Sequence, residues 1–458
     1  MRLRWKRLAV ILPVFLLVGC GAFRAAAPAA FSTPIRHIVV ILQENHSFDN
    51  VLGAFCVLHQ RCNGAASGIL YGGARVQLAP AGDIVAVVAH DVAAQHIAID
   101  GGKMDGFSRI LGCTSTYAYA CYTHYLPSQI PNVAKLATTY ALSDRTFEDG
   151  AAPSWGSHLS AVTANFDGFT GDNPAAAAPT PSAGLGPGWG CNSNRDAPWI
   201  SPGATAPTQV PACVPDHSLN TSTYPNGGAY RPTPVRHIPT IMDRLAGAGL
   251  SWKIYMSFPS APSNGYGWAI CPTFAGCIDT NQSANMVSNT MFVNDAKAGR
   301  LPNFSIVTPD ADTSQHNSYS MAAGDNWIGS LVQAIGSNAT QWQSTAIFIA
   351  WDDCGCFYDH VAPPSGLGIR VPMLMVSPYA IAAHTDSNAA SFASVLAFTE
   401  HAYGLTALNG TDANAYNYLH SFNFAQTPAP PPVMTATAIS PEEQQLIDAN
   451  PPATDDPT

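Results

Sequence analysis

The sequence predicts an α/β fold in which helices cover both faces of a sheet of buried strands. The aliphatic run 38–42 contains four β-branched residues and is bounded by polar ones, and similar runs recur at 303–307 and 345–351. A strand that is apolar on both faces must be covered on both faces. Helices expected at 238–248, 324–335 and 391–403 supply that cover, so the prediction is a three-layer α/β/α sandwich.

Composition supports a compact globular protein. The chain has 458 residues, of which 47% are hydrophobic and 11% charged, enough for one large domain or two modest ones. The net charge is −10, with only 20 Lys and Arg residues. Nucleic acid is therefore not expected as a partner, because phosphate backbones are bound by clustered Lys and Arg.

The first twenty residues predict export. A basic segment at 1–7 precedes an apolar core at 8–18 that is too short to span a bilayer. Leu-Val-Gly-Cys at 17–20 resembles the lipobox of bacterial lipoproteins, in which Cys20 would carry the lipid. We therefore expect a signal peptide at 1–20, a tether at 21–34 and a lipid-anchored protein of the bacterial cell envelope, on its periplasmic or extracellular face. The alternative is an ordinary secretory signal cut between 25 and 30.

Disulfide bonds are the expected role of the remaining cysteines. Of eleven cysteines, Cys20 belongs to the signal, which leaves ten in an exported and therefore oxidising setting. Paired CxxC spacings typical of zinc sites are absent from the sequence. Full pairing would leave little free thiol, and the pair with one intervening residue would be the weakest, because its ring is strained. The expected pairs are Cys56 with Cys62, Cys113 with Cys121, Cys191 with Cys213, Cys271 with Cys277, and lastly Cys354 with Cys356.

Polar residues follow two of the buried strands. Glu44 and Asn45 come directly after the first strand, and Asp352 and Asp353 after the strand at 345–351. Ligands of open α/β sheets bind beyond the carboxyl ends of the strands. Two adjacent carboxylates repel each other unless a cation lies between them or one stays protonated. Asp352 and Asp353 therefore predict a bound metal ion, and Glu44 and Asn45 lie where ligands of such sheets usually bind.

Ser154 is a candidate nucleophile. It lies in a turn of small residues just before an amphipathic segment, where a helix N-terminus would face the anion under attack. The alternative interpretation is a helix N-cap, for which Ser is also well suited.

Several of these segments together resemble the bacterial phosphoesterase family that holds the acid phosphatases related to phospholipase C. The resemblance rests on motifs that occur in the family's order between 35 and about 405. They are Glu-Asn-x-Ser-Phe-Asp-x-x-x-Gly at 44–53, His90 followed by Gly-Lys-Met-Asp-Gly-Phe at 102–107, the block around Ser154, Asp-Asp at 352–353 with Tyr-Asp-His-Val at 358–361, and Gly-x-Arg-Val-Pro at 368–372.

The resemblance implies the alkaline phosphatase superfamily fold and a metal-dependent site. It implies one divalent ion, whose identity the sequence does not select among Mg, Mn, Ca, Fe and Zn, held by Glu44, Asn45, Ser154, Asp352 and Asp353. It also implies that Ser154 is the nucleophile and that His90 and His316 bind the phosphate or protonate the leaving group. His158 and His360 are expected around the metal ligands without touching the ion, and His96 is expected there or in a surface or capping role.

Two departures from the family pattern concern the substrate site. Gly156 and Ser157 replace a Pro-Asn pair, which removes an Asn side-chain contact. The segment 269–272 stands where the family usually has one or two histidines, which narrows or shifts the site.

The predicted function is that of a phosphoric ester hydrolase. The expected catalytic domain spans 35–425, with a loop-rich insert at about 167–234 and a Pro-rich, acidic tail at 426–458. The absence of a long additional C-terminal region favours a phosphomonoesterase of the acid phosphatase type over a phospholipase C cutting phospholipid head groups. A protein of another class, a lipid-anchored binding protein or an inactive relative, is the further alternative.

Overall fold

A computed structural model of the chain describes residues 31–177, 186–216, 231, 233–261 and 264–449. The expected signal peptide, Cys20 and most of the tether lie outside the described residues, as does the end of the tail after 449. Within the described ranges, no helix is both long enough and apolar enough to cross a membrane.

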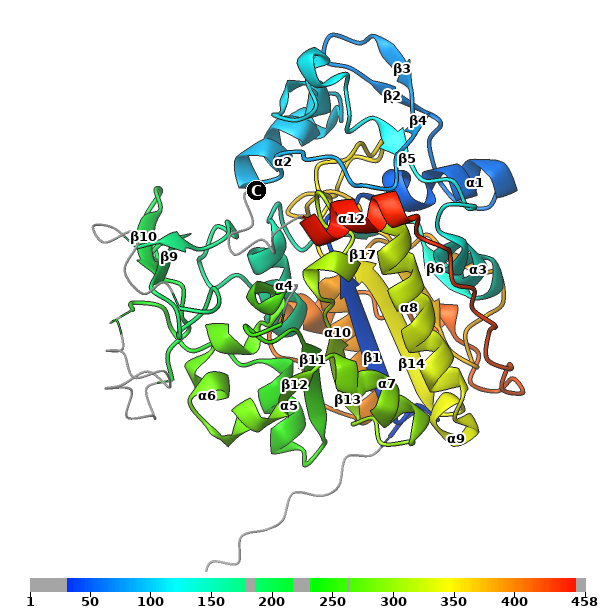
Figure 1. Cartoon of the computed structure of the whole chain (residues 1–458). Coiled ribbons are helices and arrows are strands. Elements are labelled where there is room, and N and C mark those ends of the chain that lie inside the picture. Colours follow the sequence, from blue (N-terminus) through cyan, green and yellow to red (C-terminus); the bar gives the residue numbers. More distant parts are fainter. Residues whose placement is uncertain (1–30, 178–185, 217–230, 232, 262–263, 450–458) are drawn as a thin grey trace, which may run out of the picture.

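An eight-stranded sheet forms the centre of the molecule (Figure 1). Its strands lie in the order β12 (Met286–Ser288), β11 (Trp252–Met256), β13 (Phe304–Val307), β1 (His37–Gln43), β14 (Thr345–Trp351), β15 (Met373–Val376), β6 (Ala141–Ser143) and β16 (Thr385–Asp386). The three strands predicted from buried aliphatic runs are β13, β1 and β14, and they are direct neighbours, all parallel.

Only β15 runs against the other strands of this sheet, pairing antiparallel with both β14 and β6. The segment between β14 and β15 contains no helix. Parallel neighbours need a long crossover, whereas a chain that turns back without one pairs antiparallel. This connection matters for the site, because it carries the residues that follow Asp352.

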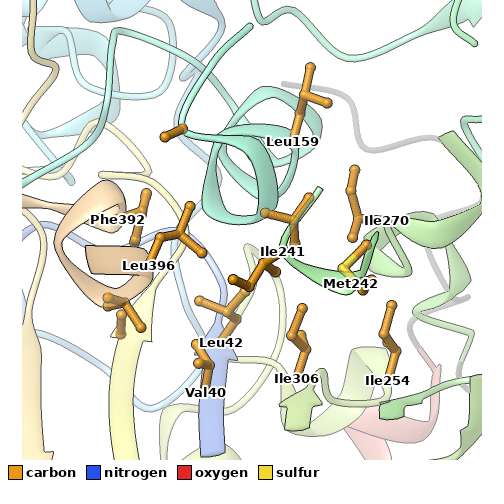
Figure 2. Close-up of a cluster of buried hydrophobic side chains, with 14 of the residues drawn as sticks. Val40, Leu42, Leu159, Ile241, Met242, Ile254, Ile270, Ile306, Phe392 and Leu396 are labelled. Atoms are coloured by element: carbon orange, nitrogen blue, oxygen red, sulfur yellow. The ribbon is translucent and has the colours of Figure 1, made fainter. Parts of the chain in front are cut away.

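Successive residues of β1 belong to two different hydrophobic cores. Val40 and Leu42 pack with α4 (Ser154–Thr163), α5 (Ile241–Gly247) and α10 (Phe392–Tyr403), as Figure 2 shows. Val39 and Ile41 pack on the other face. That face is covered by α3 (Pro131–Thr139), α7 (Thr290–Lys297) and α8 (Met321–Gly336). Helices on both faces confirm the predicted three-layer α/β/α sandwich.

Two helices begin at residues other than the predicted ones, and in both a capping side chain determines the first residue. The helix expected from 238 begins at Ile241, because Thr240 caps it by accepting from the Asp243 N–H. The helix expected from 324 begins at Met321, capped by Ser320. Side-chain caps of this kind satisfy backbone N–H groups that have no partner within the helix.

Residues 54–126 form a cap at the edge where the strands β1 and β14 end (Figure 1). The cap has its own hydrophobic core, which includes Leu78, Phe107 and Tyr122 and packs against Tyr358. Its elements are α1 (Ala54–His59), β2 (Ser67–Ile69), β3 (Arg75–Gln77), β4 (Ala79–Pro80), α2 (Val92–Ile99), the single turn η3 (Gly106–Arg109) and β5 (Thr123–His124).

The predicted insert contains a small sheet. β8 (Ala175–Ala176), β9 (Arg195–Trp199) and β10 (Thr208–Pro211) pair antiparallel. Among the smaller elements are β7 (Thr146–Phe147) paired with β17 (Ala390–Ser391), α6 (Ala275–Ile278), α9 (Ala339–Trp342), α11 (Gly410–Asn414) and α12 (Pro441–Ala449).

The segment predicted to begin the tail continues the fold. The Ala429 N–H donates to the Pro378 carbonyl at 2.9 Å, and the Trp342 indole N–H donates to the Ala429 carbonyl at 2.7 Å. Further along, the Thr435 N–H donates to Asn132 Oδ1 at 2.8 Å. Residues 426–437 therefore pack on the α3–α8 face of the sandwich.

Four of the five expected disulfides are present: Cys56–Cys62, Cys113–Cys121, Cys191–Cys213 and Cys271–Cys277. The expectation that all ten cysteines pair is wrong for the last two. Cys354 and Cys356 are buried thiols whose Sγ atoms lie 3.7 Å apart. A single intervening residue leaves little room to close a disulfide without strain.

Candidate active site

The ends of β1 and β14 bring the first predicted site residues together. The Asn45 backbone N–H donates to Asp352 Oδ1 at 2.9 Å, although the two residues are 307 positions apart in the chain. Asn45 has a positive φ of 61°, a conformation that Asn tolerates better than most residues. Parallel pairing of β1 with β14 aligns their carboxyl ends, so the residues that follow them meet at one edge.

Ser154 is the first residue of α4, and its hydroxyl faces this edge. Its Oγ lies 3.0 Å from Glu44 Oε2 and 3.2 Å from Asn45 Oδ1, both of which accept. The N-cap position belongs to Pro153. The alternative interpretation of Ser154 as the helix N-cap is therefore wrong, because Ser154 lies one position inside the helix.

His158, one helical turn beyond Ser154, reaches the same edge. Its Nε2 lies 3.3 Å from Glu44 Oε1 and 3.8 Å from Asp352 Oδ2. Burial lowers the pKa of His158 even though Asp352 opposes the shift, so the ring is neutral near pH 7. A neutral imidazole is the form that binds a metal ion.

The group Glu44, His158 and Asp352 is suited to a cation. All three are buried, and one ligand atom from each lies within 4.8 Å of the others. Asp352 Oδ2 is buried and accepts no hydrogen bond from any residue in the described ranges. A buried carboxylate oxygen without a hydrogen-bond partner destabilises the folded protein unless a cation is bound there. The three side chains therefore fit a divalent metal ion. His158 was expected near the metal ligands without touching the ion, but its ring nitrogen lies among the potential ligand atoms.

Asp353 is held differently from Asp352. Its Oδ1 accepts from the Gly355 N–H at 2.7 Å, and its own N–H donates to Asp352 Oδ1 at 2.8 Å. It is not part of the three-residue group of ligand atoms. Gly355 has a φ of +51°, and a Cβ there would lie 2.1 Å from the Asn45 carbonyl oxygen. Only glycine allows this close approach of the two loops.

His90 orients the Asn45 amide. Its Nδ1 lies 2.8 Å from the Val88 carbonyl oxygen, an acceptor, so this nitrogen carries the proton and Nε2 accepts. The acceptor Nε2 lies 3.0 Å from Asn45 Nδ2. Because the amide nitrogen is directed at His90, the amide oxygen is directed at Ser154.

His316 is the second predicted phosphate-contacting histidine, and it lies beside His90. The two ring centroids are 6.2 Å apart, and both side chains are buried. The ring of Trp268 lies 5.9 Å from that of His316. Trp268 was not predicted from the sequence, although it directly precedes the segment 269–272, where the family pattern breaks.

His360 and His96 lie outside this group. His96 is exposed on α2. His360 Nδ1 lies 2.5 Å from Asp49 Oδ2, and its Nε2 lies 3.0 Å from Asn63 Oδ1. Burial alone would lower the pKa of His360, but the hydrogen bond to Asp49 raises it overall.

Asp49, Asp359 and His360 also bring ligand-type atoms together, but an arginine already neutralises them. The buried Arg370 guanidinium lies 3.1 Å from carboxylate oxygens of both Asp49 and Asp359. It also donates to the Asp144 carbonyl at 2.8 Å. This cluster therefore ties the loops after β1, β6 and β14 to one another, and a cation there would be repelled by the guanidinium.

Residues 35–406 match the profile of the Phosphoesterase family. The match covers most of the chain, and the motifs after β1 and β14 fall within it, so the chain belongs to this family. The predicted membership is confirmed.

Among curated proteins, the chain is similar to several phospholipases C. It is 26% identical over 225 residues to Phospholipase C A of Mycobacterium tuberculosis, covering 41% of this chain and 43% of that protein. It is 27% identical over 218 residues to the non-hemolytic phospholipase C of Burkholderia pseudomallei, covering 35% and 31%. The matched region thus spans less than half the length of these relatives.

Among solved structures, a protein in the alkaline phosphatase superfamily from Vibrio parahaemolyticus aligns over 84% of this chain and 70% of its own, at 13% identity and a TM-score of 0.37.

Proposed function

We propose that the protein is a metal-dependent phosphoric ester hydrolase in which Ser154 is the nucleophile. The observation that supports this most is the position of the Ser154 hydroxyl, buried between Glu44 Oε2 and Asn45 Oδ1. Asp352, whose Oδ1 accepts from the Asn45 N–H, adds a buried Oδ2 without a hydrogen-bond partner among the described residues. A structural serine at a helix start would instead cap the helix.

One divalent ion would be held by Glu44, Asn45, Ser154 and Asp352, with His158 as a nitrogen ligand and Asp353 as a candidate from the motif. When bound, such an ion lowers the pKa of the serine hydroxyl and neutralises charge on the phosphoryl oxygens. An imidazole in the set favours a transition metal ion over Mg or Ca, which prefer oxygen ligands alone.

The chain's own groups carry the remaining chemistry. Glu44 Oε2, at 3.0 Å from Ser154 Oγ, is placed to take the hydroxyl proton as the oxygen attacks phosphorus. The P–O bond to the leaving group breaks while the Ser154–phosphorus bond forms, and His316 donates a proton to the departing oxygen. Water then hydrolyses the phosphoserine. Ser154 begins the ten-residue helix α4, whose N-terminus favours an anion at that point.

His90 has two alternative roles in this proposal. In the structure it fixes the Asn45 amide so that its oxygen faces Ser154. The phosphate contact that the motif implies would require a proton on His90 Nε2, and the ring would then release the Asn45 amide. The residues that position an attacking group within reach of phosphorus contribute to the rate through orientation alone.

Two substrate classes are compatible with this chemistry, phosphomonoesters and the phosphodiester head groups of phospholipids. The relatives named above are phospholipases C, which favours the diester class. A binding protein or an inactive relative would keep the metal group without turnover.

The test compares two chromogenic substrates on the purified full chain and on Ser154→Ala. Release of nitrophenol from p-nitrophenyl phosphate indicates a monoesterase, and release from p-nitrophenyl phosphorylcholine indicates a phosphodiesterase. Hydrolysis of neither substrate, with a range of divalent ions present, would refute the enzymatic proposal.

We further propose that the protein is anchored to the bacterial cell envelope through a lipid on Cys20. The motif at 17–20 supports this, with secretion as the outcome if the lipobox is not used. Metabolic labelling with palmitate should mark the wild-type protein and leave Cys20→Ala unlabelled.

A further inference from the structure

Apolar side chains are exposed on the cap. Tyr71, Val87 and Leu111 keep 57%, 58% and 65% of their surface accessible. The core of the cap is built from other residues, so these side chains are not required to fold it. Single exposed apolar residues are ordinary, but a contiguous group marks an interaction surface.

These residues come from neighbouring segments. The Ala89 N–H donates to the Leu111 carbonyl at 3.0 Å, which sets the strand of chain at 87–89 beside Leu111. The Arg109 guanidinium lies 4.5 Å from the centre of the Tyr71 ring, and the Tyr71 N–H donates to Ser108 Oγ at 2.9 Å. We define the cap patch as Tyr71, Val87, Arg109 and Leu111.

The cap patch is joined to the candidate active site by a short stretch of chain. His90 contacts both the Val88 carbonyl, at 2.8 Å, and the Asn45 amide, at 3.0 Å. Val87 is three residues from His90, and three residues span at most about 11 Å when fully extended. In Figure 1 the cap covers the edge at which β1 and β14 end. A surface held against the patch would therefore lie close to the phosphate-contacting histidine.

We propose that the cap patch docks the protein on the surface of zwitterionic phospholipid aggregates, which deepens the diester form of the proposed function and rests on it. Val87 and Leu111 would enter the boundary of the acyl chains. Tyr71, an amphipathic ring, suits the headgroup level.

The charges of the chain favour binding to a zwitterionic phospholipid surface over a strongly anionic one. Arg109 in the patch and Arg75 in the adjoining hairpin are both exposed and complement lipid phosphates. The whole chain carries a net charge of −10, which opposes approach to a strongly anionic surface. A phosphatidylcholine surface offers phosphates without net negative charge.

The experiment uses the full chain with Cys20→Ala in every variant, so that no lipid anchor contributes to binding. Sedimentation with sucrose-loaded phosphatidylcholine vesicles in EDTA measures docking without turnover. Val87→Asp and Leu111→Asp are the test variants. Val433→Asp is the matched control, because Val433 is 77% exposed and the next residue, Met434, donates its N–H to Gln333 Oε1 in α8. Hydrolysis of soluble p-nitrophenyl phosphorylcholine is measured in parallel.

We expect each test variant to weaken vesicle binding by about tenfold. This is the loss of affinity expected when one apolar side chain no longer transfers from water into the lipid. Hydrolysis of the soluble diester should stay within about twofold of wild type, and Val433→Asp should change neither quantity. Equal vesicle binding by wild type and both test variants would overturn the proposal. So would sedimentation showing that the patch joins two copies of the chain and that Leu111→Asp separates them, with no vesicle binding. If the soluble diester is not hydrolysed, the proposed function fails while vesicle binding in EDTA still tests the docking surface.

Discussion

Replacing Ser154 with Ala separates a nucleophile from a structural serine. The change removes a buried hydroxyl that contacts Glu44 Oε2 at 3.0 Å and Asn45 Oδ1 at 3.2 Å. A hydrogen bond to a charged group contributes about 2 kcal/mol to the free energy of unfolding. For a chain of 458 residues, that loss lowers the melting temperature by only about 2 °C.

The effect on turnover should be far larger. Loss of a nucleophile lowers kcat by roughly 10⁴-fold or more, which corresponds to about 5 kcal/mol or more of transition-state stabilisation. Differential scanning fluorimetry and hydrolysis of the better chromogenic substrate measure the two effects separately. Wild-type protein quenched during turnover should also carry phosphate on the peptide that contains Ser154.

Ser157→Ala is the matched control. Ser157 is in the same helix, is also buried, and donates to the Ala152 carbonyl at 3.1 Å. Its loss should cost about 1 kcal/mol in stability and leave turnover within a few-fold of wild type. A folded Ser154→Ala protein that retains most of its activity would refute the assignment and favour direct attack by water.

Three further predictions test the metal, the thiols and a buried acid. Dialysis against EDTA should abolish hydrolysis and one divalent ion should restore it, whereas full activity of demonstrably metal-free protein would contradict the proposed site. Denatured, unreduced Cys20→Ala protein should titrate two thiols, those of Cys354 and Cys356; finding none would show that they pair. Burial and the nearby Asp412 raise the pKa of Glu400 from its ordinary value of 4.5 to about 8. The folded state therefore holds this proton more tightly than the unfolded state, so wild type should lose stability relative to Glu400→Gln as pH rises between those two values. A stability difference between the two proteins that does not change over this pH range would rule the shift out.

The sequence alone predicted the central strands and the edge at which chemistry is placed. The aliphatic runs that became β1, β13 and β14 are apolar on both faces, a local property that one segment of sequence displays in full. Glu44, Asn45 and Asp352 were predictable for the same reason, since each directly follows such a strand. The four disulfides close short loops, so proximity in sequence was sufficient to pair them.

Only the tertiary structure decided how the side chains meet. His158 lies 114 residues from Glu44 in sequence, and its approach to Glu44 and Asp352 depends on the packing of α4 against the sheet. The contact between Asn45 and His90 depends equally on the placement of the cap. The reversed direction of β15 and the unpaired state of Cys354 and Cys356 follow from the path of the chain after β14. A sequence pattern shows which face of an element is buried, but contacts between elements depend on side-chain directions that are set only when the elements pack together.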